Sequence, residues 1–317
     1  MNFQQLRIIR EAARRNYNLT EAANALLTSQ SGASKHIKDL EDELGVALFV
    51  RRGKRLLGLT EPGKELMHIV ERMLLDANNI KSLGEEFSEC DQGKLVIATT
   101  HTQARYMLPR VVARFTELFP KVELVLHQAG PSEIAAMLQN GDADIAIATE
   151  ALKEIGSFVT FPYYTWHHAV VVHRGHPLES VRKPTLAAIA KYPIITYTEG
   201  FTGRARIDRA FAQAGLAPRV VMSALDADVI KSYVELGLGV GIIAAMAYDQ
   251  EGDLRLVHLK STHLFESNTS LIAVRKGRYL RGYAYRFMEL CARPLTADVV
   301  RAALRAEPVD RDVDREA

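Results

Sequence analysis

A dense group of hydrogen-bonding side chains lies near the start of the chain, between residues 28 and 38, and four cations follow it at 51–55. Hydroxyl and amide side chains can read base edges in the major groove of DNA, while Lys and Arg hold phosphates. An ordinary polar helix face has a similar composition, so the surrounding elements must decide between the two interpretations. The residues concerned are Thr28, Ser29, Gln30, Ser31, Ser34, Lys35, Lys38, Arg51, Arg52, Lys54 and Arg55.

A second group of possible ligands is rich in threonine and stands where short apolar runs end. Thr100, Thr102 and Gln103 follow one such run, Thr149 closes another, and Thr202 precedes a helical segment. Hydroxyls and free backbone N–H groups at strand-to-helix junctions can bind an anion without a fixed positive charge, and sulfate needs only donors at neutral pH. Alternatively, each threonine caps its own helix.

Enzymatic and metal-binding interpretations find little support. The glycines of 237–241 follow a predicted helix and precede a strand, which is the wrong order for a nucleotide-binding loop. The histidines of 167–176 would alternate between the two faces of a strand, and no carboxylate or cysteine completes a ligand set. No G-x-S-x-G motif is present, and Cys90 and Cys291 are far apart. We expect a protein that is not an enzyme and that carries no catalytic residues, metal, cofactor or disulfide.

Three helices should position the first polar group. The apolar spacing predicts a helix over 2–15, a short helix that begins at Asn18, and a third helix capped by Thr28 and stopped by Gly45. A short second helix, a tight turn and a third helix favour groove binding over a solvated face. The buried stripe predicted for the third helix is Ala33, Ile37, Leu40 and Leu44.

A basic hairpin and a long helix should come next. Gly53 is predicted to turn a small hairpin whose cations can lie along the phosphate backbone. Pro62 then falls in the first turn of a helix that continues to about residue 87, with one apolar side. A helix of this length and pattern needs a partner surface, so we expect a homodimer.

Composition and charge agree with a folded protein that has a basic N-terminal part. The hydrophobic fraction of 48% and the charged fraction of 25% exclude general disorder. Residues 1–64 hold 11 Lys and Arg against 7 Asp and Glu, a net charge of +4, which leaves −2 for the rest of a chain whose total is +2. No membrane span or signal peptide is evident, so we expect a cytoplasmic protein.

From residue 94 onward, short apolar runs alternate with helical segments, which predicts βαβ units and a parallel sheet. The alternation restarts near residue 168, which indicates a second lobe. The tail from residue 307 is rich in Asp, Arg and Glu and is predicted to be disordered.

The segment 22–48 resembles the winged helix-turn-helix of LysR-type transcriptional regulators, and the resemblance extends over nearly the whole chain. Within that family the chain is most similar to the CysB-type regulators of sulfur assimilation. The strings that carry this likeness are Ala98 to Tyr106, Ile147 to Leu152, Phe201 to Arg204 and Asp226 to Lys231.

The resemblance implies an α/β fold class with an N-terminal all-α winged helix-turn-helix and a two-lobed, periplasmic-binding-protein-like effector domain. The expected domains are 1–60 for DNA binding, 61–90 for a dimerisation helix, and 91–306 for effector binding, with a second lobe at about 165–266 and a tail at 307–317. The predicted partners are double-stranded promoter DNA, RNA polymerase and further copies of the chain, in a homotetramer.

The implied function is activation of sulfur or cysteine metabolism genes under the control of sulfate, another sulfur metabolite or an acetylserine. The alternative is a solute-binding protein for sulfate-like anions without a DNA function, which leaves the first ninety residues unexplained. Glu199 departs from the CysB pattern, which has an apolar residue there. An acid beside the anion site would repel sulfate or pair with an amine, so the identity of the effector stays open.

Overall fold

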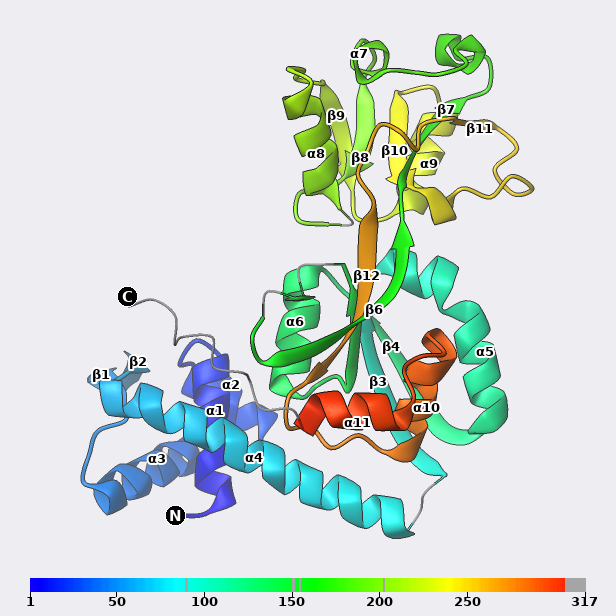
Figure 1. The fold of residues 1–317 in the computed structure, drawn as a ribbon. Helices are drawn as coiled ribbons and strands as arrows, with labels where there is room; N and C mark the ends of the chain where they lie inside the picture. Colours follow the sequence, from blue (N-terminus) through cyan, green and yellow to red (C-terminus); the bar gives the residue numbers. More distant parts are fainter. Residues whose placement is uncertain (89–90, 150–151, 154, 202, 306–317) are drawn as a thin grey trace, which may run out of the picture. The chain divides into compact units, whose positions relative to one another are not determined.

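A computed structural model describes residues 1–88, 91–149, 152–153, 155–201 and 203–305. The chain divides into two compact units (Figure 1). The N-terminal unit comprises Met1–Glu85 with Gly277–Tyr279, and the C-terminal unit comprises Glu86–Lys276 with Leu280–Ala317. The tail predicted to be disordered, 307–317, lies outside the described residues.

The N-terminal unit consists of three short helices, a hairpin and a long helix. Their core buries Leu6, Ala22, Ile37, Leu40 and Leu74. Burial of these aliphatic groups stabilises the packing of the second and third helices and so sets the direction of the third. The elements are α1 (Phe3–Arg14), α2 (Leu19–Ala25), α3 (Gln30–Leu44), β1 (Phe49–Arg52), β2 (Arg55–Leu59) and α4 (Glu61–Ser88).

Two details of α3 differ from the sequence prediction. The cap is Ser29 and not Thr28, because Ser29 has extended backbone angles and its Oγ accepts a hydrogen bond from the Gly32 N–H at 3.0 Å. Leu44, predicted as the end of the buried stripe, is 41% exposed because the buried stripe of α3 ends one turn earlier, at Leu40.

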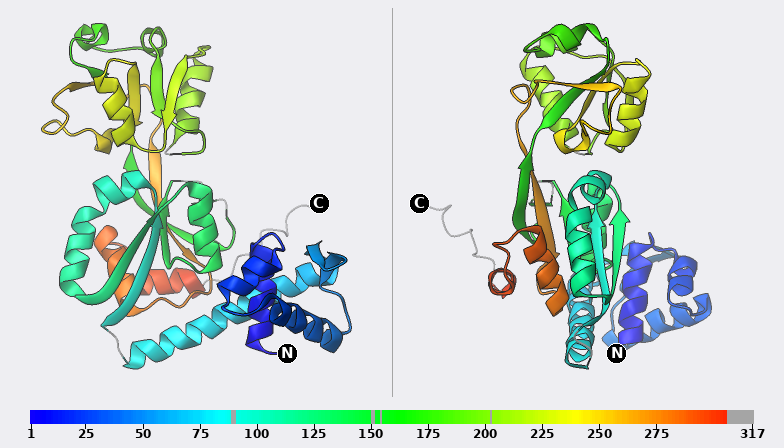
Figure 2. Two further views of the ribbon diagram at one scale, coloured as in Figure 1. Left: turned by 180° about the vertical axis from the view of Figure 1, so that it is seen from behind. Right: turned by 90° about the vertical axis from the view of Figure 1, so that its right-hand side faces the viewer.

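Lobe I of the C-terminal unit is a five-stranded sheet in the order β4-β3-β5-β12-β6, with helices on its faces (Figures 1 and 2). Its elements are β3 (Gln92–Thr99), the π-helix η1 (Gln103–Met107), α5 (Pro109–Leu118), β4 (Lys121–Gln128), α6 (Pro131–Asn140), β5 (Ile145–Ala148), β6 (Phe158–Trp166), β12 (Asn268–Arg275), α10 (Gly282–Cys291) and α11 (Ala297–Arg305).

Lobe II is a second five-stranded sheet in the order β11-β7-β10-β8-β9. Its elements are β7 (His168–His173), η3 (Pro177–Ser180), α7 (Leu186–Ile189), β8 (Ile194–Tyr197), α8 (Arg204–Gln213), β9 (Val220–Ala224), α9 (Ala227–Glu235), β10 (Val240–Ala244), η4 (Ala245–Ala247) and β11 (Leu256–Leu259). Its core is separate from the core of lobe I.

The sheets are mixed, so the prediction of a parallel sheet is correct for only part of each. β3 pairs in parallel with β4 and β5, whereas β12 is antiparallel to β5 and β6. In lobe II, β8 pairs in parallel with β9 and β10, whereas β7 is antiparallel to β10 and β11. The chain enters lobe II after β6 and returns through β12, and these two paired strands link the lobes (Figure 1).

Two elements of lobe I, β6 and α11, are not predicted by the sequence pattern. Pro162 lies inside β6, and proline argues against a central strand because it has no N–H to donate. The structure accommodates it at the edge of the sheet, where the register shifts between Ser270 and Leu271. Within the described residues, no helix combines the length and the apolar character that a membrane span requires.

Candidate functional site

The leading half of α3 presents a polar face to solvent. Ser29, Gln30, Ser31, Lys35 and Lys38 are exposed. Ser34 and Thr28 are half-buried on the same segment. The Ser29 hydroxyl serves the helix as its cap, and its oxygen also lies 3.1 Å from that of Ser31. The face is therefore available for contacts, although the Ser29 hydroxyl also serves as the helix cap.

The wing formed by β1 and β2 carries the basic residues. The strands are antiparallel and pair Arg52 with Arg55, and Gly53 turns between them with a φ of +63°, the left-handed region that favours glycine. Arg52, Lys54 and Arg55 are exposed. The predicted hairpin is confirmed by the paired strands.

A surface hollow joins the start of α3 to the wing. Gln30 from the helix and Lys54 and Arg55 from the wing line it together with Asn18 and Thr20. An amide suited to reading a base therefore stands next to two cations suited to holding phosphates.

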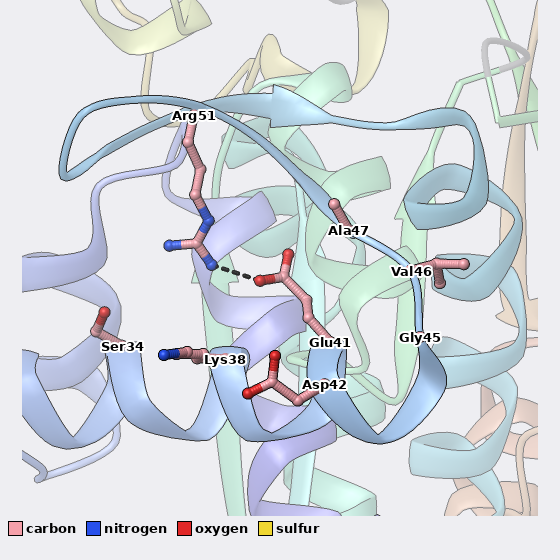
Figure 3. Close-up of a pocket in the computed structure, with 8 residues that line it drawn as sticks. All are labelled: Ser34, Lys38, Glu41, Asp42, Gly45, Val46, Ala47 and Arg51. Carbon is pink, nitrogen blue, oxygen red and sulfur yellow. Dashed lines mark hydrogen bonds and ion pairs between the residues drawn. The ribbon is translucent and has the colours of Figure 1, made fainter.

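Glu41 attaches the wing to α3 (Figure 3). Its Oε1 accepts hydrogen bonds from the backbone N–H groups of Leu48 and Phe49 at 2.8 and 3.2 Å, and its Oε2 accepts one from Arg51 Nη2 at 2.7 Å. The Glu41 side chain is only 12% exposed. Arg51, which the sequence analysis placed among the phosphate-binding cations, thus has an internal partner.

Glu41 is not among the residues that the sequence predicts to be functional. A signal was present, because Glu41 follows Ile37 by four residues and so borders the buried stripe of α3. A carboxylate at such a border requires donors, but the spacing does not reveal that the donors come from the wing.

The threonine group of lobe I gathers at the carboxyl ends of two neighbouring parallel strands. Thr99 of β3 pairs with Ile147 of β5, and its Oγ1 donates a hydrogen bond to the Ile147 carbonyl at 2.9 Å. The segment after β3 and Thr149 after β5 therefore emerge at the same edge of the sheet. Thr100, Thr102 and Gln103 are buried there, and Thr149 is half-buried. Thr202 lies outside the described residues.

Thr102 holds a buried hydroxyl. Within the described part of the chain, its Oγ1 makes no hydrogen bond of ordinary geometry. The Tyr197 hydroxyl of lobe II, which accepts from the Ala244 N–H at 2.9 Å, lies close enough to interact with it. Burial raises the pKa of Tyr197, while the Ala244 N–H and Thr102 act in the opposite direction. The end of β3 thus faces the end of β8 across the lobe junction.

Gln103 is held by lobe I itself. Its Nε2 donates to Ser270 Oγ at 3.0 Å, and its Oε1 accepts from the Tyr164 hydroxyl. Trp166 Nε1 also donates to Ser270 Oγ, at 3.1 Å. Burial raises the pKa of Tyr164 to about 12, although its bonds with Ser270 and Gln103 oppose the shift. Both polar atoms of the Gln103 amide are therefore hydrogen-bonded within lobe I, next to the threonines.

One group of side chains in the described part of the chain has atoms suited to a metal. His101, Asp226 and Asp228 bring one ligand atom each to within 4.8 Å of the others. Asp226 already caps α9 by accepting from the Val229 N–H, and Asp228 accepts from the Tyr106 hydroxyl at 2.6 Å. Lys231 Nζ lies 3.5 Å from Asp228 Oδ1. Because these donors already satisfy the carboxylates, the geometry favours an interaction between the lobes over a metal site.

Two family models match the chain. Residues 3–64 match the bacterial regulatory helix-turn-helix protein, lysR family, and residues 88–295 match the LysR substrate binding domain. The regulator SsuR of Burkholderia cenocepacia is 59% identical over 305 residues, which cover 96% of this chain and 99% of SsuR. The regulator Cbl of Escherichia coli K12 is 52% identical over 314 residues, which cover 99% of each chain.

A solved structure supports the same relationship. The crystal structure of the cofactor-binding domain of the Cbl transcriptional regulator is 48% identical and superposes with a TM-score of 0.65, covering 68% of this chain and 95% of that domain. The predicted fold class, an N-terminal winged helix-turn-helix with a two-lobed α/β domain, is confirmed. The chain belongs to the LysR family of helix-turn-helix transcriptional regulators.

Proposed function

We propose that this regulator activates genes of sulfur metabolism and that a small anion or sulfur metabolite controls it. The observation that carries the proposal is the edge of lobe I at which Thr100 and Thr102 follow β3 and Thr149 follows β5, with the Thr102 hydroxyl buried beside the Tyr197 hydroxyl. Uncharged donors of this kind suit sulfate, which needs no proton acceptor from the protein at neutral pH. The likeness of the 98–106, 147–152, 201–204 and 226–231 strings to CysB-type regulators supports the sulfur assignment.

The DNA-binding surface would comprise the exposed face of α3 and the tip of the wing. Gln30, Ser31 and Ser34 would read bases, while Lys35, Lys38 and the wing residues Arg52, Lys54 and Arg55 would hold phosphates. Arg51 would act mainly through Glu41, as a support for the wing.

The oligomer would form through α4. Ile69, Ile80, Leu83 and Phe87 are 46%, 71%, 41% and 86% exposed, which leaves an apolar surface along this helix. A second copy of the helix would cover it. We propose a homotetramer that binds promoter DNA and contacts RNA polymerase.

A thermal-shift screen tests the effector class. Sulfate, thiosulfate, adenosine phosphosulfate, a sulfonate and the acetylserines are each added to the full chain, because a ligand that binds only the folded state raises its melting temperature. We expect at least one sulfur anion to raise it and to change the affinity for promoter DNA. No shift with any sulfur compound, together with a shift by an unrelated metabolite, would contradict the sulfur assignment.

A further inference from the structure

The segment between β3 and the end of η1 belongs to lobe I and also contacts lobe II. Thr100, Thr102 and Gln103 are buried at the proposed effector site. His101 and Tyr106 make their polar contacts with lobe II at Asp228, in the first turn of α9. Any displacement of lobe II relative to this segment must therefore change the surroundings of Asp228.

Three side chains of lobe I surround the Asp228 carboxylate. The Tyr106 hydroxyl donates to Oδ1 at 2.6 Å, and His101 Nε2 lies 3.2 Å from Oδ2. Arg105 Nε is 3.9 Å from Oδ2. His101 is itself oriented within lobe I, because its Nδ1 lies 2.9 Å from Gln128 Oε1. The contact is therefore built from a segment that the sheet of lobe I holds in position.

Asp228 is also held in position by contacts within lobe II. Asp228 lies 3.5 Å from Lys231 Nζ, which also donates to the Ala247 carbonyl at 2.9 Å and lies 3.1 Å from Asp253. Burial opposes ionisation of Asp228, but the hydrogen bonds from Tyr106 and His101 and the charge of Lys231 outweigh it, so the pKa of this carboxyl is below its usual value. The carboxylate is charged and oriented when it meets lobe I.

Apolar contacts lie beside the polar one. The Tyr106 ring packs against the core of lobe II, although Tyr106 belongs to η1 of lobe I. Phe201 of lobe II lies against Gly130 of lobe I, where an added Cβ would come within 2.7 Å of the ring. The lobes thus meet through a specific hydrogen-bonded pair with close packing around it.

We propose that Asp228, with His101 and Tyr106, forms a clasp that holds lobe II closed on the 100–106 segment before the effector binds. The clasp then sets how much of the protein is ready to bind, because an effector that touches both lobes binds the closed form more tightly. This deepens the proposed function and rests on it only for the effector, since the clasp itself is a property of the ligand-free chain.

Hydrogen–deuterium exchange of the full chain without ligand tests the clasp directly. Tyr106→Phe keeps the ring and removes only the hydroxyl, so α9 itself is unchanged in sequence. Because the contact is half-exposed, we expect exchange of the peptides covering 227–235, on the other lobe, to become about three- to tenfold faster. Unchanged exchange in these peptides would overturn the proposal.

A matched control and a double variant distinguish loss of the clasp from a general loss of stability in the C-terminal unit. Tyr283→Phe also removes a hydroxyl, but this one donates to the Lys94 carbonyl inside lobe I, at 3.0 Å. It should leave the 227–235 peptides unchanged. Tyr106→Phe combined with Asp228→Asn should exchange no faster than the faster single variant, because both remove the same contact. An equal effect of Tyr283→Phe, or additive effects in the double variant, would contradict the clasp.

Calorimetry with sulfate and with adenosine phosphosulfate extends the test to the effector. A smaller closed population should weaken whichever compound binds by about three- to tenfold in Tyr106→Phe, without a change in Tyr283→Phe. If neither these two compounds nor any other compound of the thermal-shift screen binds the wild-type chain, the proposed effector class fails, whereas the exchange experiment still decides the clasp. Wild-type affinity in Tyr106→Phe would overturn the link between clasp and effector.

Discussion

The two proposed binding surfaces of this regulator differ in burial and in how far apart their residues lie along the chain. On α3 and the wing the polar groups are exposed and come from one stretch of about thirty residues. At the lobe junction the polar groups are buried or half-buried and come from segments more than a hundred residues apart, as the Tyr106–Asp228 hydrogen bond shows.

The difference follows from the ligands that the two surfaces are suited to bind. DNA is large and must be met by a protruding surface, whereas a small anion gains affinity from donors that are shielded from water. Substitutions on the exposed surfaces should therefore affect binding without affecting stability. Substitutions at the junction should affect both.

The largest expected effect tests whether the exposed apolar side chains of α4 form a binding surface. Ile69→Glu with Ile80→Glu places carboxylates on the exposed apolar side of α4, and burying them unpaired in a dimer should weaken association by roughly 3 to 5 kcal/mol. Sedimentation should show a smaller species with normal monomer stability. Asn78→Glu, on another side of the same helix, is the control. Unchanged mass in the double variant would remove α4 from the interface.

Glu41 differs from the other polar groups of the α3 and wing surface, because its side chain is mostly buried. Glu41→Ala leaves two backbone N–H groups and Arg51 without their acceptor, which should lower the free energy of unfolding by about 2 to 4 kcal/mol. Thermal unfolding measures this loss, and Glu41→Gln should recover part of it by keeping an acceptor. Asp42→Ala removes an exposed charge from the same helix and should have little effect. A loss as small as that of Asp42→Ala would show that the wing does not depend on Glu41.

Thr102→Val tests the junction. The substitution keeps the shape and deletes the buried hydroxyl, so an anion that uses it should bind more weakly by roughly 1.5 to 3 kcal/mol, while basal DNA binding persists. Thr116→Val is the control, since its hydroxyl bonds to the Val112 carbonyl within α5. Thr149→Val and Thr202→Val should behave like Thr102→Val. If these threonines only cap helices, stability should fall by about 1 kcal/mol with effector affinity intact.

The smallest expected effects distinguish phosphate-binding residues of α3 from residues that contact bases. Lys35→Ala should weaken binding to all DNA sequences and reduce the salt dependence by about one phosphate per subunit. Gln30→Ala should instead relax the base preference. Lys121→Ala, an exposed lysine of the C-terminal unit, is the control for charge. Equal, salt-independent losses on specific and random DNA in both variants would refute the assignment.

Local patterns predicted the N-terminal surface well. The apolar spacing of α3 predicts exposure of Gln30, Ser31, Lys35 and Lys38, which the structure confirms, whereas Ser34 is half-buried; Gly53 turns the wing as expected. The errors there are shifts by one residue or one turn, at Thr28 and Leu44. They arise because a cap and the end of a core depend on which neighbours are within reach.

The sequence predicts which polar residue types lie at the lobe junction, but it does not predict which of these residues contact one another. The place of the threonines after apolar runs predicts an anion site, whereas the 98–106 and 226–231 strings indicate only a resemblance to the CysB-type regulators. Nothing in either string shows that Tyr106 and His101 meet Asp228. The missed strand β6 belongs to the same problem, because its Pro162 is acceptable only where the strand lies at an edge.

The sequence by itself determined most of the elements and the basic N-terminal surface, because periodicity, caps and turns act over a few residues, and its motifs carry the resemblance to the family. Only the tertiary structure decided which polar groups contact one another: Glu41 with the wing, Thr102 near Tyr197, and Asp228 with His101 and Tyr106. The physical reason is that a buried polar group is stabilised by the donors and acceptors that folding brings to it, and their distance along the chain carries no information about that contact.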